Sequence, residues 1–428
     1  MKFTAVGDII IQRRIQQNFK GFDQLRPFIE RGDARFFNLE TTLNEEGECP
    51  ASQFSGGTYI RTSKKVLNDI KSFGFNMTSF NNNHALDFSY EGFNKTLEAV
   101  EESGFIHAGC GRNLAEASAP RFLETENGRV ALIALNSTFN PAMMAGEQTR
   151  RVKGRAGING LRVTSKFEVC EQEFEFIKKL AKDTGVNVAR EITTKEGYYA
   201  PPADNEANFG QLTFIKSDRN KWVRKVMQAD LDRVEKAIEE ARWQADAVLI
   251  SIHSHELDGT CKEDISEFLR DFAHFCIDKG ADAVIGHGPH LLRPIEVYND
   301  KPIFYSLGDF VLQLYNVEFA PKEFYDSYSL TPDDTVYQLL KTRSKNFTVG
   351  LMEDRKMFET VIPYWEMENG KLTRLELLPV MGAMSGNQSE IGLPKIAKDT
   401  SFMQRLADIS KPFGVTMHEE NGVFVCQW

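Results

Sequence analysis

Short apolar segments alternate with amphipathic patterns along much of the chain, and this alternation limits the folds that it can adopt. Seven runs rich in Val, Ile, Leu and Phe are typical of buried strands: KFTAVGDII, ARFFNLE, FNMTSFNNN, RVALIALN, AVLISIH, ADAVIGHG and KPIFYSLG. Four segments with apolar residues at three- and four-residue spacing predict helices: SKKVLNDIKSFG, SYEGFNKTLEAVEESG, DLDRVEKAIEEARWQ and DISEFLRDFAHFCIDKG. Strand–helix–strand alternation predicts an α/β fold with largely parallel sheets.

Two regions depart from this pattern. Residues 141–226 are polar, and the stretch TRRVKGRAGINGLR concentrates basic residues and glycines, so we interpret the region as an insertion or lid beside the core. From residue 347 onward, FTVGLM, FETVIPYWEME, GKLTRLELLPV and GVFVCQW predict antiparallel strands, with a helix near LPKIAKDTSFMQRLADIS. The predicted organisation is a core over residues 1–346 and a C-terminal β-rich extension over 347–428 that completes or flanks it.

Composition and charge exclude several classes of protein. A net charge of -10 and a pI near 5.5 argue against nucleic-acid binding, although a local basic pocket for an anion is compatible with them. No run approaches the ~20 apolar residues needed to span a bilayer, so we predict no membrane span. The start, MKFTAVGDII, enters a strand at once and does not read as a secretory signal. Six scattered cysteines form no CxxC pair, and we expect a cytoplasmic protein with reduced thiols.

Polar side chains of the types that bind metals recur where the predicted strands end. In open α/β sheets, functional sites form beyond the carboxyl ends of the strands. Five of the eight histidines fall in three of these turns. The residues at the strand ends are Asp8, Asn38, Glu40, Asn83, His84, His253, His255, His287 and His290.

These residue types indicate metal chemistry. Carboxylates, amide oxygens and imidazoles without a thiolate suit Mn, Fe or Zn, and two ions about 3.5–4 Å apart can clamp a phosphoryl or carbonyl group. We therefore expect one or two divalent ions. The alternative for His287 and His290 is a pair of loop histidines with no ligand role. Asp8, Asn38 and Glu40 could instead cap a turn or a helix.

Several motifs together resemble one protein family. GDI, NLE, NNHALDFSYEGF, HSHE, GHGPHLLRPIEVY and KPIFYSLGDF occur in this order over roughly residues 1–312. They resemble the CapA-type (poly-γ-glutamate synthesis protein) family of the calcineurin-like metallophosphoesterase superfamily. The resemblance implies a four-layer αββα sandwich of two mixed sheets, with a metal centre at one sheet edge, to which the insertion and the C-terminal extension are added.

The resemblance also implies roles for individual residues. Glu40 stands where a bridging carboxylate is expected, and His84 stands where a general acid or substrate contact is expected. The implied metal ligands are Asp8, Glu40, Asn83, His253, His287 and His290.

This sequence departs from the family pattern at several points. Ile10 occupies the position of the histidine in the superfamily's Asp-x-His motif, so one metal position lacks an imidazole. Ser254 and His255 stand where a Trp-Gly pair is usual, and Asp309 stands where the family commonly has the Asn of SLGNF. His255 and Asp309, together with Asn38, are candidate extra ligands or hydrogen-bonding partners of ligands.

Three further residues each allow two interpretations. Asp87, three residues after His84, could orient that imidazole or be a solvated aspartate at a helix start. Arg155 could bind a carboxylate or phosphate, and a solvated loop is the alternative. Arg61 could do the same from the glycine-containing stretch GGTYIRTS, and a plain turn is the alternative.

The sequence thus predicts a metal-dependent hydrolase that acts on an anionic small molecule or peptide. The simplest form is a phosphoesterase with metal-activated water, in which His84 and Asp87 supply acid catalysis. Two alternatives stay open. One is a CapA-like enzyme that hydrolyses, ligates or epimerises γ-glutamyl or other carboxylate-rich peptides. The other is a non-catalytic accessory subunit of poly-γ-glutamate capsule synthesis.

Overall fold

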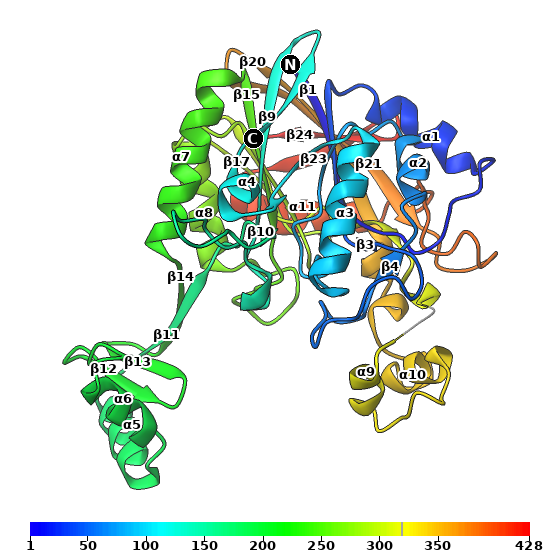
Figure 1. Cartoon of the computed structure of the whole chain (residues 1–428). Helices are drawn as coiled ribbons and strands as arrows, with labels where there is room; N and C mark the ends of the chain where they lie inside the picture. Colours follow the sequence, from blue (N-terminus) through cyan, green and yellow to red (C-terminus); the bar gives the residue numbers. More distant parts are fainter. Residues whose placement is uncertain (318–319) are drawn as a thin grey trace. The chain divides into compact units, whose positions relative to one another are not determined.

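The computed structural model describes residues 1–317 and 320–428 and shows a mixed α/β fold with several mixed sheets (Figure 1). The chain divides into two compact units. Unit 1 comprises Met1–Gly160 and Asp232–Trp428, and unit 2 comprises Leu161–Leu231. All seven apolar runs predicted to be strands contain a strand of unit 1.

The larger sheet of unit 1 joins N-terminal parallel strands to C-terminal antiparallel ones. Its order is β23-β24-β21-β20-β1-β2-β5-β6, and β19 also pairs with β1 and β22 with β21. The parallel strands are β1 (Lys2–Ile10), β2 (Ala34–Leu39), β5 (Met77–Ser79), β6 (Ile106–Ala108) and β19 (Asp309–Leu312). The antiparallel strands are β20 (Glu359–Glu368), β21 (Lys371–Gly382), β22 (Pro394–Ile396), β23 (Thr416–Glu420) and β24 (Val423–Gln427).

The second sheet of unit 1 has the order β17-β18-β16-β15-β9-β8. Its four inner strands are mutually parallel and are β9 (Gly128–Asn136), β15 (Ala247–His253), β16 (Ala283–His287) and β18 (Lys301–Phe304). Its outer strands, β8 (Arg121–Thr125) and β17 (Ile295–Tyr298), run antiparallel to their neighbours. Short pairs are formed by β3 (Thr42–Leu43) with β4 (Arg61–Thr62), and by β7 (Cys110–Gly111) with β10 (Gly157–Ile158).

All the predicted helices form, and the structure adds others. The predicted ones are α2 (Val66–Lys71), α3 (Ser89–Ser103), α7 (Gln228–Gln244), α8 (Glu267–Asp278) and α11 (Phe402–Ser410). The additional helices of unit 1 are α1 (Lys20–Ile29), α4 (Leu114–Ser118), α9 (Lys322–Asp326) and α10 (Val336–Arg343). Within residues 1–317 and 320–428, no helix is long and apolar enough to cross a membrane.

Two apolar clusters hold the larger sheet in place. One cluster includes residues from both sheets, such as Phe3 of β1, Phe304 of β18 and Trp365 of β20, so the two sheets share a core. The other contains Leu25 of α1 and Phe93 of α3 and covers the opposite side of β1 and β2. The carboxyl ends of the parallel strands are thereby fixed against each other by apolar packing.

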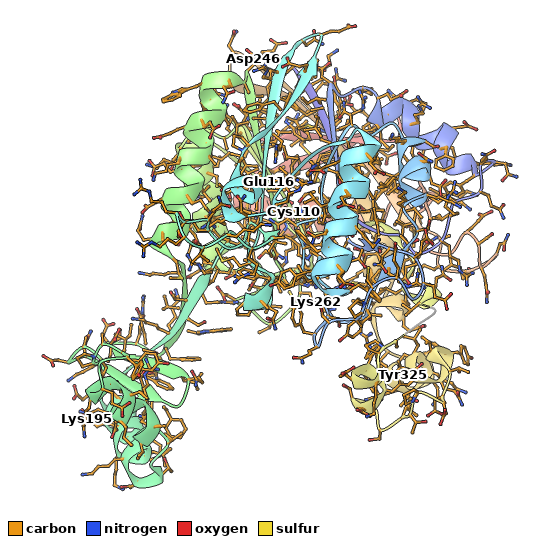
Figure 2. All side chains as sticks on the ribbon, in the orientation of Figure 1. Cys110, Glu116, Lys195, Asp246, Lys262 and Tyr325 are labelled. Carbon is orange, nitrogen blue, oxygen red and sulfur yellow. The ribbon has the colours of Figure 1, made fainter. Side chains whose placement is uncertain are left out.

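The compact inserted unit is shorter than the predicted insertion over 141–226. Residues 141–160 lie in unit 1, where β10 pairs with β7 through Ile158 and Cys110, the latter labelled in Figure 2. The Asn159 amide also donates to the carbonyl of Ala134 on β9. Within this stretch, residues 147–153 are exposed, whereas residues 157–160 are buried against the core. A lid function for the insertion stays a prediction.

Unit 2 is a small α/β structure. Its sheet has the order β12-β13-β11-β14, formed by β11 (Val163–Val169), β12 (Glu206–Phe209), β13 (Leu212–Lys216) and β14 (Lys221–Val226). Helices α5 (Glu171–Thr184) and α6 (Val188–Lys195) complete it, and Phe174 of α5 packs with Val169 and Ala207. Arg162 and Asp230, close to its two ends, form a bidentate ion pair that brings the ends together.

Trp365 provides a test of the shared core. Its side chain is 0% exposed, stacks on Phe3 at 5.2 Å between ring centroids, and contacts Phe304 at 5.3 Å. We expect Trp365→Ala to lower the free energy of unfolding by about 3–5 kcal/mol in urea titrations, because it leaves a large cavity. Trp243→Ala is the matched control, since Trp243 is 87% exposed, and we expect almost no change. Equal effects of the two substitutions would contradict the packing described.

Candidate metal centre

The strand ends of the two sheets bring the predicted site residues to one place. Asp8 lies on β1 and Glu40 directly follows β2, both in the larger sheet. His253 and His287 are the last residues of β15 and β16 in the second sheet, and they face each other across paired strands. All four side chains are buried, so this edge is an interior site.

Asp8 is held by two hydrogen bonds. The Asn38 amide donates to its Oδ1 at 2.7 Å, and the backbone N–H of Gly288 donates to its Oδ2 at 2.8 Å. The Nδ1 atoms of His287 and His253 lie 3.4 Å and 3.7 Å from its Oδ1. Burial would raise the pKa of Asp8, yet these neighbours hold it below its usual value. Asp8 is therefore an ionised, fixed carboxylate, and Asn38 serves as its hydrogen-bond donor.

Glu40 is a buried carboxylate without a donor. Among the residues that the structure describes, neither of its side-chain oxygens has a hydrogen-bond partner, and the side chain is 0% exposed. The Nε2 atoms of His84 and His253 each lie 3.8 Å from its Oε1. Burial, and then the nearby carboxylates of Asp8 and Asp309, raise the pKa of Glu40 well above its usual value. A protonated Glu40 could bond Asp8, so it lacks a partner only when ionised, which is the form that binds a cation.

Imidazole nitrogens and an amide oxygen converge beside Glu40. His253 Nε2 lies 2.9 Å from Asn83 Oδ1 and 3.0 Å from His255 Nε2. His253 Nδ1 lies 2.9 Å from His287 Nδ1. Burial lowers the pKa of both His253 and His255 well below the usual value, which favours the neutral form that donates a lone pair to a metal.

His290 and Asp309 form the third side of the site. Their Nδ1 and Oδ1 atoms lie 3.0 Å apart, and Asp309 stands opposite Asp8 in the parallel pair of β19 and β1. The backbone of His290 has φ +63°, a conformation that is costly for a residue other than glycine and that often marks a functional site. Burial raises the pKa of Asp309 to about 6 against the opposing effect of His290.

Three overlapping groups of these residues could hold a metal ion. Within each group, the potential ligand atoms all lie within 4.8 Å of one another. The groups are Asp8–His253–His287, Glu40–His253–His255, and Asp8–Glu40–His290–Asp309. The six residues predicted as ligands are thus gathered in one buried site, Asn83 through its contact with His253, and His255 and Asp309 join them. Their role as ligands remains a prediction.

His84 and Asp87 form a hydrogen-bonded pair at this site. His84 Nδ1 lies 2.7 Å from Asp87 Oδ2, which also accepts the backbone N–H of Ile60. Asp87 Oδ1 accepts the N–H of Gly56, and a Cβ added to Gly56 would come within 2.6 Å of the His84 ring. Asp87 is buried and not a solvated helix-start residue, so the carboxylate fixes the ring with Nε2 toward Glu40.

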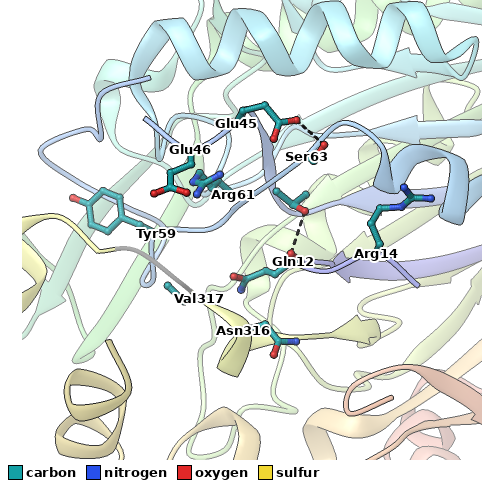
Figure 3. A pocket seen from close by; sticks show the side chains of 10 residues that line it. Gln12, Arg14, Glu45, Glu46, Tyr59, Arg61, Ser63, Asn316 and Val317 are labelled. Atoms are coloured by element: carbon teal, nitrogen blue, oxygen red, sulfur yellow. Dashed lines mark hydrogen bonds between the residues drawn. The ribbon is translucent and has the colours of Figure 1, made fainter. Parts of the chain in front are cut away.

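The two predicted anion-binding arginines occupy different surroundings. Arg61, on β4, lines a cavity of about 250 Å³ together with Gln12, Arg14, Glu46 and other residues (Figure 3). Its strand β4 pairs with β3, which begins two residues after Glu40, and the residues that line the cavity include none of the candidate ligands. Arg155 donates to the backbone carbonyl of Met144 in a polar stretch of unit 1. Substrate binding by either arginine stays a prediction.

Sequence reasoning missed three residues that support the site. Arg293 is 0% exposed, donates to the carbonyl of Lys262 at 2.9 Å (Lys262 is labelled in Figure 2) and approaches the carbonyl of His255 at 3.5 Å. Glu256 accepts hydrogen bonds from the hydroxyl groups of Ser137, Thr138 and Ser254. Ser251 Oγ lies 2.7 Å from His287 Nε2. An arginine within the apolar stretch HLLRPIEVY was the available signal, since a charge there must be satisfied internally.

Known proteins identify the family. Residues 2–314 match the family model described as "Bacterial capsule synthesis protein PGA_cap". The chain belongs to this family. The match confirms the resemblance seen in the sequence motifs.

Several relatives of this PGA_cap family member span most of its length. "Uncharacterized protein y4sH" of Sinorhizobium fredii is 30% identical over 438 residues, which cover 98% of this chain and 91% of that protein. "PGA biosynthesis protein CapA" of Bacillus subtilis is 24% identical over an alignment that covers 86% of this chain and 81% of the Bacillus protein. "Probable polyglutamine synthesis accessory protein Rv0574c" of Mycobacterium tuberculosis is 25% identical over 65% of this chain and 55% of its own.

The environment of Glu40 generates a stability prediction for the metal-free protein. We expect Glu40→Gln to raise the free energy of unfolding of chelator-treated protein by about 1–3 kcal/mol at neutral pH, because the raised pKa of Glu40 makes the folded protein either bury a charge or take up a proton, and glutamine does neither. Thermal unfolding with and without a chelator measures this effect. If metal-free Glu40→Gln is less stable than the metal-free parent, Glu40 has a donor that this geometry does not contain.

Proposed function

We propose that this chain is a metal-dependent hydrolase that acts on an anionic substrate, on a four-layer αββα sandwich of the calcineurin-like type. The observation that carries the proposal is Glu40, a fully buried carboxylate that has no donor for either oxygen among the described residues and that faces potential ligand atoms from both sheets. Such a group is costly in the interior unless a cation compensates it.

The residues present fit a divalent metal. Oxygen and imidazole ligands without thiolate suit Mn, Fe or Zn, and burial lowers the pKa of His253 and His255, which favours their neutral form. The proposed ligands are Asp8, Glu40, Asn83, His253, His287 and His290. When bound, the metal would lower the pKa of a bound water and polarise the bond to be cleaved. Asn38 and Ser251 would keep Asp8 and His287 in position through the hydrogen bonds described above.

His84 would handle the proton of the leaving group. Its Nδ1 is fixed by Asp87, so Nε2 is the nitrogen presented to the site, on the side of Glu40. A histidine oriented in this way can protonate the leaving oxygen. Arg61, in the cavity of Figure 3, would bind an anionic group of the substrate through its guanidinium.

The bond that is cleaved has two candidates. A phosphoester is the simplest, because a cationic centre complements a phosphate. A γ-glutamyl amide is the second, and one observation favours it: the family and the Bacillus subtilis relative are named for capsule and PGA biosynthesis. A polarised carbonyl would suit amide hydrolysis, ligation or epimerisation equally well.

A substrate panel separates these functions. Protein loaded with Mn, Fe or Zn is assayed with phosphomonoesters, phosphodiesters and γ-glutamyl peptides, the last by mass spectrometry in heavy water to separate hydrolysis from proton exchange. We expect turnover that a chelator abolishes and that added metal restores. Absence of turnover on all three classes, with bound metal demonstrated, would contradict a hydrolase and favour an accessory subunit.

His84 gives the sharpest residue-level prediction. We expect His84→Asn to lower turnover by about 10²–10⁴-fold on the substrate that the panel identifies, with bound metal unchanged, because only proton transfer is lost. Asp87→Asn should lower it by about 10–100-fold, since the ring remains but loses its orientation. His418→Asn, an exposed histidine, is the control. Loss of metal from His84→Asn would make His84 a ligand instead.

A further inference from the structure

Two metal-binding groups occupy positions where the sequence departs from its family, namely Asp309 and His255. One of the expected ligands is also missing, because Ile10 takes the place of a histidine. Ile10 is 1% exposed and packs with Ile60, Leu312 and Phe358 in an apolar cluster. Position 10 therefore supplies nothing to a cation, and the ligand set must be completed elsewhere.

Asp309 stands where a replacement ligand is needed. It is the direct neighbour of Asp8 in the parallel pair of β1 and β19, and one of its oxygens lies within 4.8 Å of ligand atoms of Asp8, Glu40 and His290. Its Oδ1 accepts from His290, whereas its Oδ2, among the described residues, is buried without a hydrogen-bond partner. An orphaned oxygen inside a ligand cluster is an independent sign of a missing cation.

His255 belongs to a second group on the other side of Glu40. Its Nε2 lies 3.0 Å from His253 Nε2, and the two imidazoles and Glu40 offer atoms within 4.8 Å of one another. The backbone of His255 is held through both its N–H and its carbonyl group. Its N–H donates to Thr138 Oγ1 at 2.9 Å, and its carbonyl lies 3.5 Å from a nitrogen of the buried Arg293. This support holds the imidazole in the site.

We infer that Asp309 takes the place of the missing imidazole as a ligand of one cation, and that His255 is a direct ligand of a second cation, with Glu40 shared between the two. The first position is formed by Asp8, Glu40, His290 and Asp309, and the second by Glu40, Asn83, His253 and His255. His287, which groups with Asp8 of the first position and His253 of the second, lies beside both. Three carboxylates nearly balance two divalent cations, whereas two carboxylates would leave a larger buried excess of positive charge.

The inference rests on the proposed metal centre and is tested by metal binding without an activity assay. Chelator-stripped protein is titrated with Mn²⁺ by calorimetry, bound metal is counted by elemental analysis, and exchange coupling between ions is followed by electron paramagnetic resonance. We expect two ions per chain and a coupled spectrum. Asp309→Asn keeps an oxygen that can accept from His290 but removes the anionic ligand, and His255→Phe keeps the ring but removes its nitrogens.

Each variant should weaken one position by about 10–100-fold or more and abolish the coupled spectrum, while the other position still binds. Asp408→Asn and His418→Phe, at exposed positions, are the matched controls and should bind two ions like the parent. A cooperative thermal unfolding transition of each metal-free variant serves as the control that the variant is folded.

The outcomes separate this inference from the proposed function. Two unweakened positions in Asp309→Asn would limit Asp309 to orienting His290 and overturn its assignment, and the same result in His255→Phe would overturn that of His255. A parent that binds a single ion would overturn the two-cation arrangement but leave a metal-dependent hydrolase intact. A parent protein that binds none of Mn, Fe and Zn would overturn both the two-cation arrangement and the proposed metal-dependent hydrolase.

Discussion

The burial of three carboxyl groups where the edges of two sheets meet is the constraint on which the rest of this structure depends. Asp8, Glu40 and Asp309 place three carboxylates in the interior, each at most 2% exposed. Removing an ionised carboxylate from water costs several kcal/mol unless it is compensated. The adjacent His253 and His255 do not compensate it, because burial lowers the pKa of both. Against the effect of burial, Asp309 raises the pKa of His290, so that imidazole compensates Asp309 but leaves Asp8 and Glu40. A cation at this edge would offset the cost of burying these carboxylates in their ionised form.

Unusual backbone features allow the strand ends to come this close. A Cβ on Gly7 would lie 1.9 Å from the carbonyl oxygen of Gly308, so β1 can approach the segment before β19 only because residue 7 has no side chain. Gly288 has φ +117° and directs its N–H at Asp8, and His290 adopts φ +63° two residues later. The strain of these turns is offset by the apolar core around Trp365, which fixes both sheets.

The sequence predicted the seven apolar strands of unit 1 and the gathering of candidate ligands, because apolar runs that end in polar metal-binding residues are a strong pattern in parallel sheets. It wrongly predicted a strand at FTVGLM, where residues 347–350 lie in a turn that starts with Phe347 at φ +56° and Leu351–Glu353 form a 3-10 helix. It did not predict α1, since Phe19 provides no polar cap and Pro27 lies inside the helix. It predicted an insertion over 141–226, whereas the compact second unit begins at Leu161, because the chain first pairs β10 with β7 in unit 1. It also did not predict that Arg293 supports the site, because the partners of this buried charge are distant along the chain.

Anomalous X-ray scattering from crystals grown with Mn²⁺ tests the central claim most directly, because it locates cations without reference to activity. We expect anomalous density from Mn²⁺ within direct coordination distance, about 2.0–2.3 Å, of Asp8, Glu40 and His253. An occupied Mn²⁺ elsewhere on the chain, with this buried edge empty, would contradict it.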